Sequence, residues 1–109
     1  MKTLKQFLRE TKAIDDLMKA PAEWPSGYSY VARVEIEVPI DKLQATQKDV
    51  DSSTVSAYVK GHGDFQGQVP EVVLSKQNGK YLIIDGHHRV AAEILKGREK
   101  IKVELVGEI

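Results

Sequence analysis

Five consecutive residues, Asp85-Gly86-His87-His88-Arg89, combine the side chains that bind and move phosphate groups. Glycine permits a sharp turn and lets a ligand approach the backbone. Arginine offers a planar fork of donors that matches a phosphate, and histidine donates hydrogen bonds and exchanges protons near neutral pH. An ionised aspartate only accepts, so beside a phosphate it needs Mg²⁺ or a substrate hydroxyl. The residue types therefore predict a phosphate site with a metal ion.

The flanking residues indicate how this stretch is presented. "YLII", residues 81–84, is an apolar run that fits a buried strand, and "RVAAEILK", residues 89–96, has helical periodicity with Gly97 as its stop. The amide groups at the start of such a helix, with the positive end of its dipole, bind anions. The predicted phosphate-binding residues are Gly86, His87, His88 and Arg89; the predicted catalytic residues are Asp85, His87 and His88; the predicted metal ligand is Asp85.

Simpler interpretations of the same residues stay open. Asp85 could cap the helix, and the two histidines could be surface residues of a loop. A zinc site could be drawn from Asp85, His87, His88 and the distant His62. Adjacent histidines in one turn seldom reach one metal ion, and the chain has no HExxH motif, so zinc is disfavoured.

The remaining pattern predicts an α+β domain with a small mixed, mostly antiparallel sheet flanked by helices. Residues 1–30 are expected to form an N-terminal amphipathic helix and a linker packed on the core, and residues 31–109 the main domain. Alternation predicts strands over 30–38 and 100–106, and Asn78-Gly79 between two apolar runs predicts a hairpin. The other expected elements are a short turn and loop over 40–51, a helix over 52–61 and a glycine-rich loop over 61–70.

Composition limits the function classes. The 109 residues are 41% hydrophobic and 29% charged, as in a folded domain, and 16 basic side chains balance 16 acidic ones. This balance argues against coating nucleic acid by bulk charge. The chain has no cysteine, which excludes thiolate chemistry. No apolar run approaches the roughly 20 residues that span a bilayer, and no secretory signal is recognised, so we expect a cytoplasmic protein without a membrane partner.

Residues 31–106 resemble the ParB/sulfiredoxin-like fold. The resemblance is carried by "VEIEVPIDKL", by "VPEVVLSKQNGKYLIIDGHHRVAAEILKGREKIKVELV", and by the order strand, proline, strand, turn, strand, "DGHHR", alanine-rich helix, glycine, strand. In that superfamily the Gly-x-x-Arg turn holds the phosphates of ATP, ADP or CTP with Mg²⁺. The resemblance therefore implies nucleotide binding at Gly86, His87, His88 and Arg89.

Departures from the pattern separate the family members. Sulfiredoxins carry a catalytic cysteine where this chain has His87, so sulfinic acid reduction is excluded. Partition proteins of the ParB type resemble the chain only in their first domain, and their centromere binding is not carried over. The Asp-Gly-His-x-Arg form is more similar to free serine kinases of this fold. Those kinases use a glutamate base soon after the first strand, whereas region 41–51 offers only Asp41, Asp49 and Asp51.

Three functional hypotheses follow. The first is an ATP- or ADP-dependent phosphotransferase or phosphohydrolase (ATPase), with the glycine-rich loop and its His62 and Asp64 closing over the ligand. The second is a ParB-like DNA-binding protein or nuclease, similar to small stand-alone phage and plasmid proteins, whose cationic cluster comprises Arg89, Lys96, Arg98, Lys100 and Lys102. The third is a non-catalytic phage or plasmid protein that binds a partner through its N-terminal helix.

Overall fold

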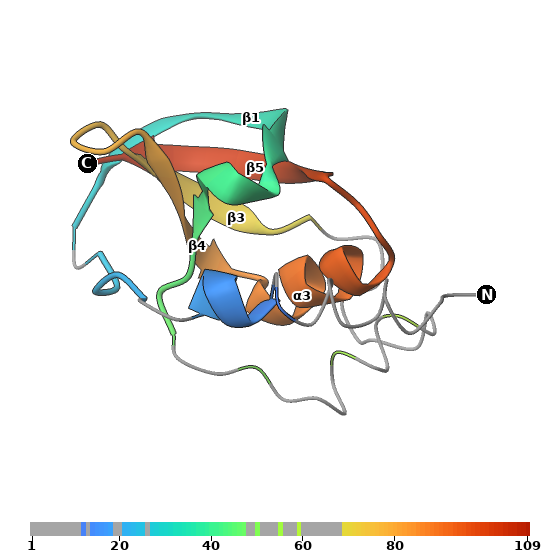
Figure 1. The fold of residues 1–109 in the computed structure, drawn as a ribbon. Coiled ribbons are helices and arrows are strands. Elements are labelled where there is room, and N and C mark those ends of the chain that lie inside the picture. Colours follow the sequence, from blue (N-terminus) through green and yellow to red (C-terminus); the bar gives the residue numbers. More distant parts are fainter. Residues whose placement is uncertain are drawn as a thin grey trace.

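The computed structural model describes residues 12, 14–18, 21–25, 27–47, 50, 55, 59 and 69–109. Within these ranges the chain forms a five-stranded sheet in the order β1-β5-β3-β4-β2, with helix α3 lying against one side of it (Figure 1). The elements are β1 (Ser29–Pro39), the 3-10 helix η1 (Ile40–Lys42), β2 (Leu43–Gln44), β3 (Glu71–Ser75), β4 (Lys80–Asp85), α3 (His87–Leu95) and β5 (Lys100–Glu108).

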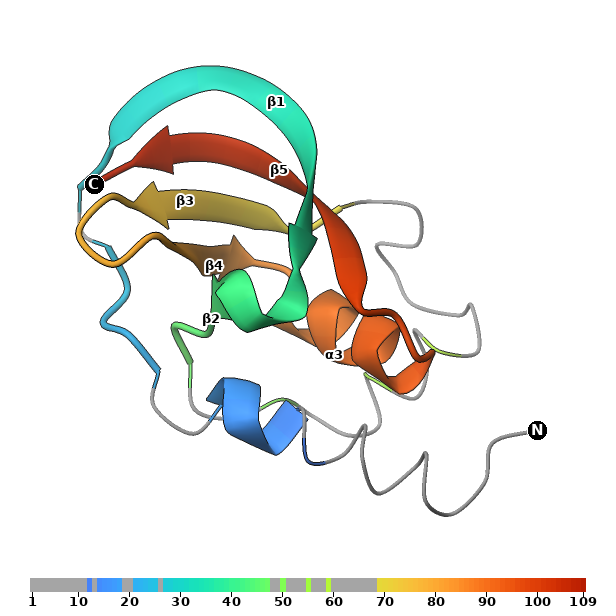
Figure 2. The same ribbon diagram turned by 45° about the horizontal axis from the view of Figure 1, so that its top comes forward.

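The sheet is mixed. The pairs β1–β5 and β3–β4 are antiparallel, while β3–β5 and β2–β4 are parallel. The long β1 curves over the sheet and returns toward η1 (Figure 2). The predicted α+β class with a small mixed sheet is confirmed, and the antiparallel pairs supply most of the paired residues.

Strand β2 corrects part of the prediction of a short turn and loop over 40–51, since residues 43–44 form a strand after the turn of η1. The strand pairs only Leu43 with Tyr81 and Gln44 with Leu82. Two residues are too few to show an alternating pattern, so the sequence carried no strand signal here. Leu43 is buried in the main core, and Ala45 just after the strand is also buried, so apolar burial holds the segment at the edge of the sheet.

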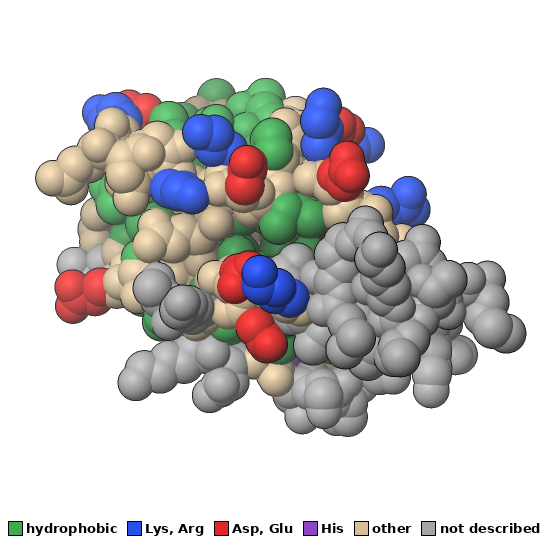
Figure 3. Space-filling model, in the orientation of Figure 1, with side chains coloured by type: hydrophobic (Ala, Val, Ile, Leu, Met, Phe, Trp, Pro, Cys, Tyr) green, Lys and Arg blue, Asp and Glu red, His purple; other side chains and the backbone are tan. Residues whose placement is uncertain are grey.

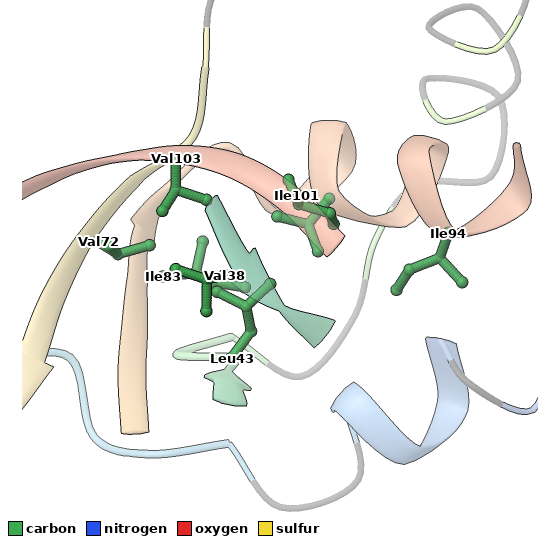
Figure 4. Close-up of a cluster of buried hydrophobic side chains, with 8 residues drawn as sticks. Val38, Leu43, Val72, Ile83, Ile94, Ile101 and Val103 are labelled. Carbon is green, nitrogen blue, oxygen red and sulfur yellow. The ribbon is translucent and has the colours of Figure 1, made fainter. Parts of the chain in front are cut away.

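Side chains from all five strands and α3 form the main core. Figure 4 shows them converging, with Ile94 contributed by α3. The buried members are Val38, Leu43, Val72, Ile83, Val90, Ile94, Ile101 and Val103. The core therefore fixes the end of β4 against the start of α3, which is where the phosphate-binding residues were predicted.

The predicted hairpin is confirmed, with a longer loop than a two-residue turn. Residues 76–79 connect β3 to β4, and the Gly79 amide donates to the Ser75 carbonyl at 2.8 Å. Gly79 has φ +72°, a conformation that favours glycine. Asn78 acts through its side chain, because its Oδ1 accepts the Lys80 amide at 2.9 Å.

The predicted glycine stop of the helix is also confirmed. Gly97 has φ +85° and donates to the Ile94 carbonyl at 2.9 Å, while the Arg98 amide donates to the Glu93 carbonyl at 3.1 Å. These two bonds form a Schellman motif, which satisfies the last carbonyls of the helix. The helix begins two residues earlier than the periodic segment indicated, at His87.

Part of the predicted N-terminal helix is described. Residues 14–18 are helical, and Ile14 and Leu17 pack against the main core on the side of α3 (Figure 1). Tyr30, at the start of β1, is 83% exposed. No helix in the described ranges is long and apolar enough to span a membrane. Most of the predicted helices 3–19 and 52–61, and loop 61–67 with His62 and Asp64, lie outside the described residues.

Candidate phosphate site

The predicted site is a sharp turn between β4 and α3. Asp85 is the last residue of β4, and Gly86 follows with φ +96° as the N-cap residue of α3. The first helical hydrogen bond joins the Val90 amide to the Gly86 carbonyl at 3.0 Å. An α-helix leaves the amides ahead of this bond outside its own ladder. The turn therefore presents the helix start that the sequence predicted.

Gly86 is required by its backbone and by its neighbour. A Cβ atom built on Gly86 would lie 2.9 Å from the Pro70 Cα atom, closer than real carbon contacts. Pro70 is held in place because its carbonyl accepts the Glu104 amide at 2.8 Å. The chain before β3 thus packs directly against the turn.

Replacing Gly86 with alanine is expected to lower the free energy of unfolding by about 1–2 kcal/mol from the left-handed backbone alone, with a further cost for displacing Pro70. Chemical denaturation of the wild type and the variant measures this difference. Gly27→Ala is the matched control, since nothing lies within 4 Å of a Cβ at Gly27 and its φ is not positive. Equal loss in both variants would contradict this account of Gly86.

No side chain of the cap residue or of the first turn of α3 satisfies the free amides or balances the positive end of the helix dipole. Gly86 offers no side-chain cap, and the first turn holds no acidic residue. Asp85 precedes the cap residue and is exposed, so it does not occupy the N-cap position that the simpler interpretation gave it. The positive end of the helix dipole is therefore not neutralised by a side chain of the first turn.

Arg89 lies in the first turn of α3, and its guanidinium has a donor that is not used. Its side chain is only 18% exposed, and its Nε lies 3.4 Å from Glu93 Oε1. The Nη1 atom is buried, and no hydrogen-bond partner for it exists within the described ranges. A buried donor left unsatisfied costs about 1–3 kcal/mol. An anion at this atom would remove that cost.

Glu93 is shared by three cations. Besides Arg89, it lies 3.6 Å from Lys96 Nζ and, through Oε2, 3.4 Å from Arg98 Nε. One carboxylate cannot neutralise three positive groups. Within this group of four side chains, the three positive charges are held around one negative charge.

His87 occupies a different place from the one expected. Its side chain was predicted to face a ligand, but the residue is buried, with 6% exposed. Its Nε2 accepts the Thr46 backbone amide at 2.9 Å. Burial, followed by the charge of His88, lowers the pKa of His87 to about 4. The ring is therefore neutral at physiological pH and has one nitrogen already engaged inside the fold.

Thr46 is the residue that the sequence did not single out. Its amide donates to His87, and its hydroxyl donates to the Ile83 carbonyl at 2.6 Å. It lies about forty positions from the turn in sequence, within a stretch predicted as loop, so no local spacing could have identified it. Only the parallel pairing of β2 with β4 brings it to the site.

The described residues contain no group of three or more histidine, aspartate or glutamate side chains placed to hold a metal ion. Asp85, His87 and His88 are adjacent in sequence, yet His87 is turned inward toward Thr46. Asp85 is exposed and is paired across the sheet with Glu71, and Mg²⁺ usually takes one or two carboxylates together with substrate phosphates and water.

No protein-family model and no curated protein matches this sequence. Among solved structures, the chain is similar to a free serine kinase, a glutamate-to-glutamine mutant in complex with AMP, with a TM-score of 0.52 and 21% sequence identity over 79% of this chain. The chain spans 35% of the length of that kinase chain. The similarity establishes the fold, and it agrees with the predicted ParB/sulfiredoxin-like architecture.

Proposed function

We propose that this protein binds an adenine nucleotide through its phosphate at the turn formed by Gly86, His88 and Arg89, and that it uses the nucleotide in phosphoryl transfer or hydrolysis. The observation that carries the proposal is the buried, unsatisfied Nη1 of Arg89, a residue of the first turn of a helix that has no side-chain cap. Such a pair of donors suits a phosphate oxyanion. The similarity to an AMP-bound kinase supports an adenine nucleotide as the ligand.

Each residue of the turn has a separate role in this proposal. Gly86 allows the sharp turn against Pro70, and the amides of the first helical turn bind phosphate oxygens. Arg89 contributes a charged donor whose direction is set by Glu93. His88, which is partly exposed, donates to a phosphate oxygen and stabilises charge that develops there. His87, with its Nε2 engaged by Thr46, is not proposed as a proton donor.

Asp85 is proposed to hold Mg²⁺ together with the nucleotide phosphates. The carboxylate is exposed at the end of β4, next to Gly86. Bound there, Mg²⁺ would neutralise the charge between the phosphates and the carboxylate. The remaining groups of the turn bind and orient the phosphate chain without a metal ion.

The acceptor of the phosphoryl group depends on a base outside the turn. Region 41–51 has aspartates where the kinases have their glutamate base, and the sequence left the base unassigned. Asp41 lies exposed in η1, where its backbone carbonyl accepts Lys80 Nζ at 2.6 Å. Asp49 and Asp51 lie outside the described residues. Water and a small hydroxyl compound are therefore both candidate acceptors.

Calorimetric titration tests the binding proposal. AMP, ADP, ATP and CTP are each titrated into the protein with Mg²⁺ and with EDTA. We expect saturable binding of the adenine nucleotides and tighter binding of ADP and ATP when Mg²⁺ is present, because Asp85 then opposes the phosphate charge less. Release of inorganic phosphate from ATP, with and without free serine, separates hydrolysis from transfer. Absence of heat with all four nucleotides would overturn the proposal.

The DNA-binding alternative is not carried into the proposal. Of the five cations predicted to contact DNA, Arg89, Lys96 and Arg98 are paired with Glu93. On the face drawn in Figure 3, basic and acidic side chains are interspersed over the described part of the chain. Binding to a DNA phosphate backbone would fall steeply with added salt, so titrations with a DNA duplex and with AMP, each at two salt concentrations, distinguish the two ligands.

A further inference from the structure

The loop after β2 and the start of α3 are joined through one buried side chain. His87, the first residue of α3, accepts the Thr46 amide on its Nε2 at 2.9 Å. The Thr46 hydroxyl lies 3.4 Å from the same nitrogen and donates to the Ile83 carbonyl of β4 at 2.6 Å. Three elements that belong to different parts of the sequence thus meet at the base of the phosphate turn.

This connection is needed because β2 is a weak anchor. The strand contributes two residue pairs at the edge of the sheet, and the chain leaves the sheet directly after Gln44. Ala45 is held by the Ala22 amide, which donates to its carbonyl at 2.8 Å. Two hydrogen bonds of Thr46 tie this segment to the β4–α3 turn.

The direction of the hydrogen bond defines the state of the ring. A backbone amide can only donate, so Nε2 must carry no proton, and the proton of the neutral ring sits on Nδ1. A protonated Nε2 would face the Thr46 amide donor to donor. The charged neighbours that act on the ring are Asp85 and His88, whereas the β2 loop presents the uncharged Thr46 and Gln47.

We infer that His87 is a positioning residue: its Nε2 acceptor holds the loop 45–47 against the β4–α3 turn, so that this loop forms part of the nucleotide site. The inference rests on the proposed function for its ligand. The hydrogen bond between Nε2 and the Thr46 amide does not depend on any ligand. Without this acceptor, the loop 45–47 would be less firmly held, and the positions of the groups in the turn would be less well fixed.

Two substitutions separate the acceptor from the bulk of the ring. His87→Leu fills similar space without an acceptor, and His87→Gln offers an amide oxygen at comparable reach. We expect His87→Leu to weaken AMP binding by roughly tenfold, the effect of losing one hydrogen bond that orders a site, and His87→Gln to restore most of it. Equal AMP affinity in wild type and His87→Leu, or no recovery in a folded His87→Gln, would overturn the inference.

NMR on the wild type tests the hydrogen bond between His87 Nε2 and the Thr46 amide without a ligand. Long-range ¹H–¹⁵N spectra are expected to show an unprotonated Nε2 on His87 at neutral pH, and the Thr46 amide is expected to exchange slowly with solvent. A proton on Nε2, or a rapidly exchanging Thr46 amide, would overturn the inference even if the variants fail to fold. If wild type binds no AMP while both NMR results hold, the proposed function fails and the role of His87 as the anchor of the loop remains.

Discussion

Replacing Arg89 with alanine is expected to weaken AMP binding by roughly 10- to 100-fold, which corresponds to about 1.5–3 kcal/mol for a hydrogen bond to a charged group. The reason is the arrangement of the guanidinium. Its Nε is held near Glu93 and its buried Nη1 has no partner among the described residues. The side chain is therefore pre-oriented, and little conformational freedom is lost when a phosphate binds. Titration calorimetry of AMP measures the change.

Arg98 supplies the matched control. It shares Glu93 through Oε2, but its side chain is 64% exposed and it lies beyond the end of α3. Arg98→Ala removes the same charge and the same type of ion pair, and we expect AMP affinity to change by less than about threefold. Arg89→Lys keeps the charge and loses the planar fork, so intermediate affinity is expected. Equal weakening by Arg98→Ala and Arg89→Ala would indicate that only the overall charge matters, and would contradict the site.

The free energy of unfolding is expected to fall by up to roughly 3 kcal/mol as the pH decreases from 6.5 toward 4, because of His87. Burial lowers the pKa of His87 from 6.5 to about 4 in the folded protein, whereas the unfolded chain has the ordinary value. Between these values the unfolded state binds a proton that the folded state does not. Stability therefore rises with pH through this window and is fully present above pH 6.5.

Urea unfolding at several pH values between 4 and 7.5 measures this dependence. In His87→Gln, which cannot titrate in this range, the slope with pH is expected to flatten. His88→Gln is the control that removes the neighbouring histidine and keeps the buried one, so most of the slope should remain. A flat profile in the wild type would mean that His87 titrates normally and is not held by Thr46.

Local signals in the sequence were sufficient to predict the elements whose hydrogen bonds join residues only a few positions apart. The hairpin depends on Gly79 and Asn78, which act within a few residues, and the end of α3 depends on Gly97 and two backbone bonds inside the same turn. Gly86 was recognised for the same reason, since a sharp strand-to-helix turn needs a positive φ. These turns, together with the alternating strands, were enough to predict a mixed sheet and to place the site between a strand and a helix.

The direction of each side chain at the site could not be predicted in this way. His87 and His88 are neighbours of one type, yet only the packing of α3 on the sheet turns His87 inward to meet Thr46. Other features depend on residues that are far apart in sequence, as in the pairing of β2 with β4 and the contact of Gly86 with Pro70. The unsatisfied Nη1 of Arg89 depends on burial, which only the folded structure defines. Periodicity and turn chemistry report interactions over a few residues. The sequence therefore shows which residue types occur at the turn, whereas the tertiary structure decides which of their side chains can face a ligand.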